Sequence, residues 1–117
     1  MRAEVKGFHS PDLDWLSEFP EDPNDFGILL QVFVGPASKE GSESFDIMIC
    51  TPSFVARRIA ESGIVDGRHH LLVSHFKKDD IEFYITKRVN AIDEPSWVEV
   101  ANKLSRLGRW EFEDYDD

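Results

Sequence analysis

Three histidines that lie close together in the sequence are the first side chains to consider for metal binding or acid–base catalysis. His69, His70 and His75 belong to the stretch HHLLVSHF, whose composition predicts a β-strand. Neighbouring residues of a strand point to opposite faces, so His69 and His70 should diverge. No cysteine cluster and no helical histidine pair completes a set of ligands. We therefore expect no metal site here.

The other reactive side chains also lack the partners that catalysis requires. Cys50, the only cysteine, lies inside a predicted strand and is interpreted as a small buried hydrophobe. No serine stands in a G-x-S-x-G motif, and no glycine-rich loop has the spacing that binds phosphate. With 23 acidic residues in the chain, neighbouring carboxylates are expected by chance and do not indicate a catalytic pair. We expect no catalytic residue, no cofactor and no enzymatic activity; an enzyme that uses carboxylates with His69 or His70 is the alternative.

Two segments that combine carboxylates with aromatic side chains indicate protein binding instead. The segment from Ser10 to Asp25 contains three prolines, which interrupt helices and strands, so it is predicted to be a long surface loop with at most one helical turn. The second segment is the C-terminal EDYDD. Exposed aromatic rings beside carboxylates are good interface anchors. The residues predicted to bind a partner are Asp12, Asp14, Trp15, Glu18, Glu21, Asp22, Asp25, Asp114, Tyr115 and Asp116.

Trp15 has a second interpretation, because a large apolar side chain can also attach a loop to the core. The sequence leaves the two roles open for this residue. For Trp97 and Trp110 it favours core packing.

The charge of the chain indicates the kind of partner. The formal net charge is −10, with −7 in residues 1–50, +2 in residues 51–92 and −5 in residues 93–117. A surface of one sign attracts molecules of the opposite sign, so a basic partner is expected, although acidity also serves solubility. Direct binding to nucleic acid is disfavoured, because phosphate contacts need clustered lysine and arginine.

The elements that must position these segments are organised around a β-hairpin. Residues 28–34 and 45–50 are β-branched and aromatic runs, and residues 35–42 between them are turn formers. Leu30, Val32 and Val34 alternate on one face, and Phe45, Ile47 and Ile49 can share it. Both faces of the hairpin are fairly apolar, which places it in the middle of a sheet.

The remaining segments predict further strands and helices. Edge and final strands are expected at Arg2–Phe8 and around Trp110 and Phe112. One helix is expected from the N-cap Thr51 to Gly63, one from a cap at Asp79 or Asp80, and one from the capping box of Ser96 and Glu99 to Gly108. The predicted fold is a single α+β domain over residues 1–117, with a mostly antiparallel sheet centred on the hairpin and packed by about three helices.

The same sequence features suggest where the protein works. No apolar run reaches the roughly 20 residues of a membrane helix, and the first ten residues lack a signal-peptide core. With one cysteine in a strand, a cytoplasmic protein is expected. Its oligomeric state stays open.

Three segments carry a resemblance to a known family. VFVGP…GSESFDIMICTP, then GRHHLLVSHF, and finally SWVEVANKLSRLGRWEFEDYDD resemble the immunity protein 8 family of bacterial polymorphic toxin systems, in the right order over nearly the whole chain. The early PDL…PEDP…F is similar to the N-terminal region of that family.

This resemblance implies a cytoplasmic protein that binds and inhibits a cognate toxin domain, without catalytic residues of its own. It does not specify the toxin. The acidity of the chain favours a nuclease, because a groove that holds phosphates is basic. A small acidic adaptor with no toxin partner is the remaining alternative.

Overall fold

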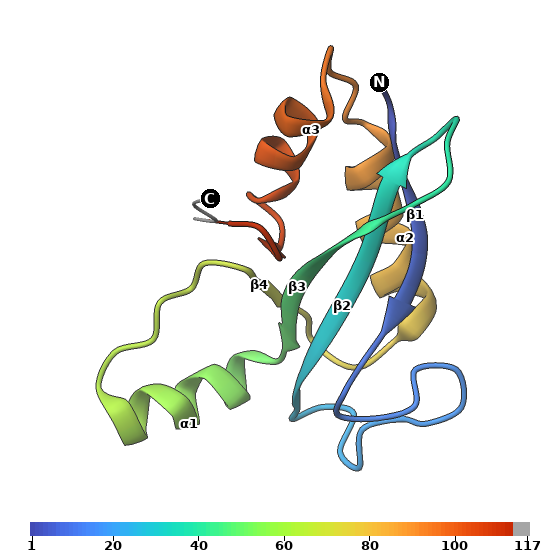
Figure 1. Cartoon of the computed structure of the whole chain (residues 1–117). Coiled ribbons are helices and arrows are strands. Elements are labelled where there is room, and N and C mark those ends of the chain that lie inside the picture. The colour runs from blue at the N-terminus through green and yellow to red at the C-terminus, as the bar shows by residue number, and fades with distance from the viewer. Residues whose placement is uncertain (114–117) are drawn as a thin grey trace.

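The computed structural model describes residues 1–113 and consists of a five-stranded mixed sheet with three helices (Figure 1). In chain order the elements are β1 (Ala3–His9), β2 (Gly27–Pro36), β3 (Glu43–Cys50), α1 (Pro52–Ser62), β4 (His70–Leu72), α2 (Lys78–Asn90), α3 (Trp97–Leu104) and β5 (Arg109–Trp110). The α+β class is confirmed. Strands β1, β2 and β3 form the antiparallel part of the sheet, and β1 lies at its edge.

The hairpin of β2 and β3 is the centre of the sheet, as predicted. Beyond β3, two short strands share one side: β4 pairs parallel to it through Met48 to Cys50, and β5 pairs antiparallel to it through Phe45 and Asp46. Leu30 lies opposite Ile47 in the register of the hairpin, and both side chains are fully buried. Strand alternation therefore places one apolar face of the hairpin in the core.

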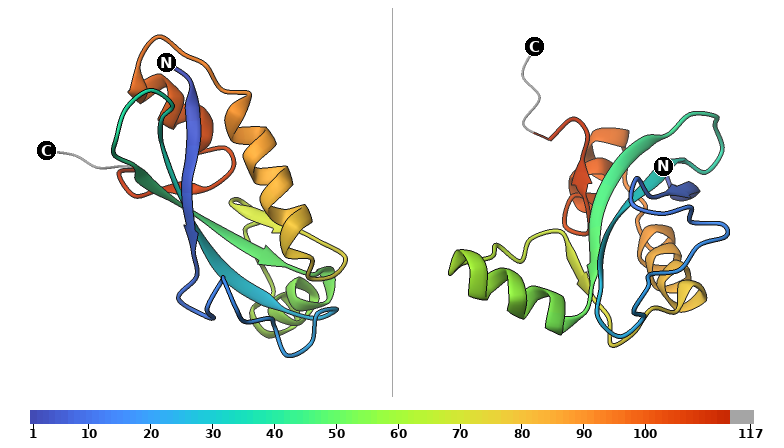
Figure 2. Two further views of the ribbon diagram at one scale, coloured as in Figure 1. Left: turned by 90° about the vertical axis from the view of Figure 1, so that its right-hand side faces the viewer. Right: turned by 90° about the horizontal axis from the view of Figure 1, so that it is seen from below.

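The two faces of the sheet are covered differently. Helices α2 and α3 cover the face of Leu30 and Ile47, and they complete the core with Ile81, Ile85, Val89, Val100, Ala101 and Leu104. Helix α1 buries none of its residues and lies on the other side of the hairpin from α2 (Figure 2, right). On this uncovered side Gln31, Asp46 and Met48 are only half-buried. Two helices thus pack against the sheet, and the third stands away from it.

The helix boundaries show which local sequence signals predicted a helix end correctly and which did not. The capping box of α3 is confirmed: the Ser96 hydroxyl accepts from the Glu99 N–H, and the Glu99 carboxylate accepts from the Ser96 N–H. Helix α3 ends at Leu104, four residues before Gly108. The expected aspartate cap of α2 was wrong, because the helix begins at Lys78 and its two aspartates lie in the first turn. Carboxylates in that turn still stabilise the positive end of the helix dipole.

The predicted strand over residues 69–76 is reduced to three residues in β4. Its parallel partner β3 ends at Cys50, whose carbonyl accepts the last bond, from the Val73 N–H. Beyond that point Phe76 turns into the core, and its N–H donates to the Pro23 carbonyl. The strand therefore ends where its partner ends. Among residues 1–113, no helix is long and apolar enough to cross a membrane.

Candidate functional site

The acidic loop, residues 10–26, is attached to the core by Trp15. This side chain is only 4% exposed, its ring centroid lies 5.8 Å from that of Phe76 and 6.2 Å from that of Phe8, and its indole N–H donates to Glu82 over 3.4 Å. Lys78 lies over the indole ring. Trp15 therefore has the attachment role, and little of its ring is left to contact a partner.

The aspartates of the loop accept hydrogen bonds that hold the backbone in place. Asp12 accepts from the N–H of Leu29 over 2.7 Å, in the part of β2 that β1 does not pair. Asp14 accepts from the N–H of Leu16, and this bond lowers the pKa of Asp14. The Glu18 N–H donates to the Asp14 carbonyl over 2.8 Å, which forms the single helical turn expected in the loop. The loop is thus an ordered surface.

Five carboxylates of the acidic loop line one groove between the loop and α1. They are Asp12, Glu18, Glu21, Asp22 and Asp25. The volume of this acidic groove is about 800 Å³, and α1 contributes Phe54 and Arg57 to its wall. Asp14 lies outside it, in a neighbouring hollow beside Leu16. The sequence analysis placed these carboxylates on one loop. The structure adds that the loop lies beside α1, a contact that the sequence did not predict.

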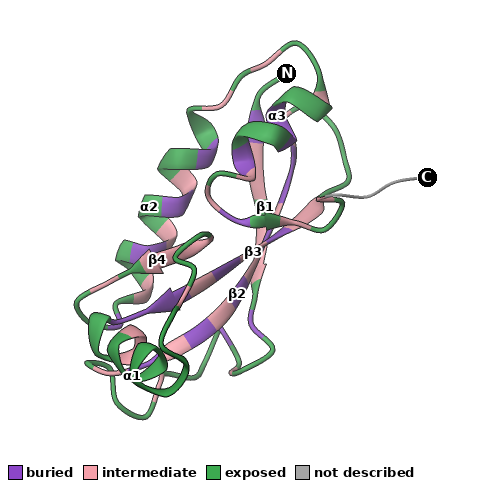
Figure 3. Ribbon diagram, turned by 90° about the vertical axis from the view of Figure 1, so that its left-hand side faces the viewer, coloured by how far each residue is buried: buried purple, intermediate pink, exposed green. Residues whose placement is uncertain are grey.

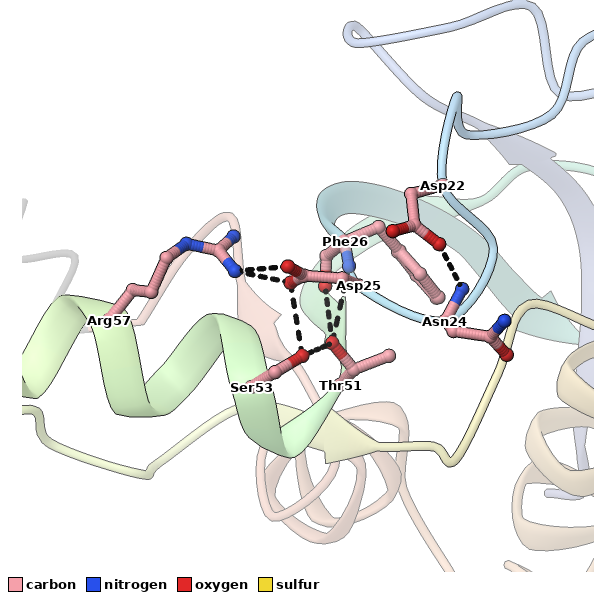
Figure 4. A network of polar contacts seen from close by, with 7 residues as sticks. All are labelled: Asp22, Asn24, Asp25, Phe26, Thr51, Ser53 and Arg57. Atoms are coloured by element: carbon pink, nitrogen blue, oxygen red, sulfur yellow. Dashed lines mark hydrogen bonds and ion pairs between the residues drawn. The ribbon is translucent and has the colours of Figure 1, made fainter.

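A polar network joins the end of the loop to the start of α1 (Figure 4). Arg57 donates to both oxygens of Asp25, and Ser53 donates to Asp25 over 3.0 Å. The Arg57 guanidinium lowers the pKa of Asp25, and Asp25 in turn raises the pKa of Arg57. Thr51, predicted as the N-cap, occupies that position but does not cap the helix; its buried hydroxyl accepts from the Phe26 N–H over 3.2 Å. These bonds fix the direction in which α1 leaves the sheet.

A second groove, on the other flank of α1, was not predicted. Its volume is about 430 Å³, and we call it the apolar groove because Met48, Phe54, Val55, Ile64 and Val65 line it. Charged and polar residues at its rim are Arg58, Glu61, Ser62, Asp66 and His70. The apolar stripe of α1 consists of Phe54, Val55 and Ile59, and no local signal in the sequence indicated that the core would leave these residues half-buried or exposed.

The C-terminal residues Asp114, Tyr115 and Asp116 lie outside the described residues. The last described residue, Glu113, pairs with Arg68 over 2.7 Å. The preceding Glu111 donates its N–H to the Ser44 carbonyl, near the hairpin turn. The acidic loop adjoins the opposite end of β3, at Cys50 and Thr51. The described part of the C-terminal segment therefore does not merge with the acidic loop into one surface.

His69, His70 and His75 each make contacts of their own and do not converge on one site. The His69 ring lies 2.7 Å from the Ser105 carbonyl and the residue has a φ of +63°, so it precedes the strand instead of belonging to it. His70 lies 2.9 Å from the Arg68 carbonyl, and His75 contacts the Ser74 hydroxyl. Over residues 1–113, no three histidine, cysteine, aspartate or glutamate side chains are grouped to hold a metal ion. Cys50 is fully buried, which raises the pKa of its thiol.

Comparison with known proteins gives one match. The model of a family described as immunity protein 8 matches residues 3–115 of the 117-residue chain. No curated protein and no solved structure matches it.

Proposed function

The chain belongs to the immunity protein 8 family, immunity proteins of toxin systems, and from this premise we propose that it neutralises a cognate toxin domain as a stoichiometric protein inhibitor. The proposed contact surface is the acidic groove. Trp15 is left out of this surface because it is buried. Asp114, Tyr115 and Asp116 remain predicted contacts. Binding would take place in the cytoplasm of the protected cell.

The unpaired charge of the acidic groove is the observation that carries this proposal. Five carboxylates face a single guanidinium, and Arg57 is already bonded to Asp25. Among residues 1–113, no lysine, arginine or histidine lies within ion-pair distance of Asp12, Glu18, Glu21 or Asp22. A groove with five carboxylates and one arginine, which is already paired with Asp25, is negative overall, so it attracts a basic partner and orients it during encounter.

A nuclease is the toxin class that this charge favours. A nuclease must present lysine and arginine to the phosphates of its substrate. Carboxylates held on an ordered loop can occupy the same positions as those phosphates and exclude the nucleic acid. Inhibition would then require no chemistry in this protein.

The test compares two variants with equal changes in net charge. In the loop variant Glu18→Gln, Glu21→Gln and Asp22→Asn remove three carboxylates of the acidic groove. In the control variant Glu40→Gln, Asp79→Asn and Asp80→Asn remove three exposed carboxylates elsewhere. The binding probe is the inactivated product of the adjacent upstream gene, which we expect to carry the toxin domain, and its association is measured by stopped flow at several salt concentrations. The loop variant should associate roughly 3- to 10-fold more slowly at low salt, with a flatter salt dependence.

Both variants should melt within a few degrees of the wild type, because the substituted side chains are exposed. Equal association rates and equal salt slopes for the two variants would exclude the acidic groove as the steering surface. Failure of the wild-type protein to bind this toxin domain, or to block its activity, would contradict the proposed function itself.

A further inference from the structure

Helix α1 is an unusual element because it protrudes from the domain. Nine of its eleven residues are exposed and none is buried (Figure 3). An isolated helix of this length is marginally stable in water. It is held at its N-terminal end, by the network of Asp25, Ser53 and Arg57 and by the Phe54 ring against Gly27. The fold thus keeps α1 in a defined direction without covering its sides.

Apolar side chains remain open to solvent beside this helix. Ile64, which lines the apolar groove just after α1, is 85% exposed, and Ile59 within α1 is 44% exposed. The groove has the arrangement of an interface pocket, with apolar walls and a rim that includes Arg58, Glu61 and Asp66. A solvent-exposed apolar pocket with a polar rim is a common place for a partner side chain to insert.

Phe54 connects the apolar groove to the acidic groove, since its ring lines both. A partner that spans α1 must therefore present a basic patch directly next to an apolar side chain. This requirement defines the chemistry of the partner more narrowly than charge alone.

We propose that α1 and the apolar groove form the anchor of the toxin interface, and that the occupant is a large apolar side chain projecting from the basic surface of the toxin. The inference rests on the proposed function and deepens it. The acidic groove attracts and orients the toxin, and the apolar groove holds it. Solvent-accessible charges act mainly on association, whereas buried apolar anchors act mainly on dissociation.

The test uses the double variant Ile64→Ser, Val65→Ser, which removes apolar surface from the groove without changing charge. Both residues lie in the loop after α1, so the fold should persist. The matched control is Phe83→Ser, Val98→Ser, on α2 and α3, where the side chains are 70% and 58% exposed. Binding to the same inactivated toxin domain is followed by surface plasmon resonance.

We expect the groove variant to dissociate at least about 10-fold faster than the wild type, with an association rate within about 2-fold, and the control to match the wild type in both rates. Hydrogen exchange of the amides in residues 54–66 should slow when the toxin domain binds. The inference would be overturned if the groove variant dissociated at the wild-type rate and the toxin domain did not slow amide exchange in residues 54–66. The proposed function would remain intact in that case. Faster dissociation of the control alone would place the anchor on α2 and α3 and would also overturn it. A wild-type protein that does not bind would instead contradict the proposed function.

Discussion

At the scale of single residues, Glu43 makes the contact that the sequence did not reveal. Its carboxylate accepts from the indole N–H of Trp97 and, over 2.8 Å, from that of Trp110. Both tryptophans are half-buried and pack against the core, as their core assignment predicted. One acid of β3 thereby joins α3 and β5 to the sheet. Charge-assisted bonds of this kind are stronger than neutral ones.

Replacing Glu43 should weaken this part of the fold. Glu43→Ala leaves two half-buried indole donors without their acceptor, so the free energy of unfolding should fall by about 1–3 kcal/mol. The measurement is urea denaturation followed by tryptophan fluorescence. Glu40→Ala, an exposed acid in the turn of the same hairpin, is the control and should change stability by less than about 0.5 kcal/mol. Equal urea midpoints of unfolding for the two variants would show that the hydrogen bonds from the two indoles do not contribute to stability.

At the scale of elements, the direction of α1 depends on a close contact at the start of β2. A Cβ atom added at Gly27 would lie 2.3 Å from the Phe54 ring. No real side chain tolerates that distance, so the ring packs on a backbone that only glycine leaves free. This contact between β2 and α1 therefore acts together with the network of Asp25, Ser53 and Arg57 to hold the protruding helix.

Gly27→Ala should displace the Phe54 ring and with it the N-terminal turn of α1. Overpacking costs about 1–3 kcal/mol, and the lower end applies because Phe54 is only half-buried. The expected result is a loss of about 1 kcal/mol in stability, with amide chemical-shift changes in two-dimensional NMR confined to α1 and the start of β2. Gly67→Ala is the control, because a Cβ atom added at Gly67 would have no atom within 4 Å. Unchanged shifts in α1 would mean that Phe54 does not set its direction.

At the scale of the whole molecule, the sheet has one covered and one open face. The covered face contains the core, and Trp15 attaches the acidic loop on that side, whereas the open face and α1 remain exposed (Figure 2, right). The described carboxylates of the acidic groove lie at the end of the sheet where α1 begins. The core therefore fills one side of the hairpin, while the acidic groove at the end of the sheet and the exposed helix α1 are available to a partner.

Substitution of Ile47 tests whether the chain unfolds as one unit. Its side chain is fully buried in the central strand, so Ile47→Asp places a charge in the core without a partner. The free energy of burying this charge is comparable to the total stability of a domain, about 5–15 kcal/mol, so we expect the whole fold to be lost. The loss is measured by circular dichroism and by the collapse of NMR shift dispersion. Met48→Asp, at the adjacent half-buried position on the open face, should stay folded. A folded Ile47→Asp variant would contradict the placement of the core.

The sequence by itself determined the elements whose signals are local. Alternation in β2 and β3 predicted the hairpin and its buried face, and the capping box predicted the start of α3, because strand period and helix capping depend on residues within a few positions. The aspartate cap of α2 and the length of β4 were mispredicted, since one depends on the approach of the preceding chain and the other on the length of a partner strand.

Only the tertiary structure decided which apolar side chains are covered. The aromatic Trp15 in the acidic loop is buried, whereas no residue of the regular helix α1 is buried and its apolar Ile59 is exposed. Nothing local distinguishes these two cases, because burial depends on what the rest of the chain packs against each segment. The same holds for the acidic groove: the sequence placed its carboxylates on one loop, and the packing of that loop beside Phe54 and Arg57 made them a surface.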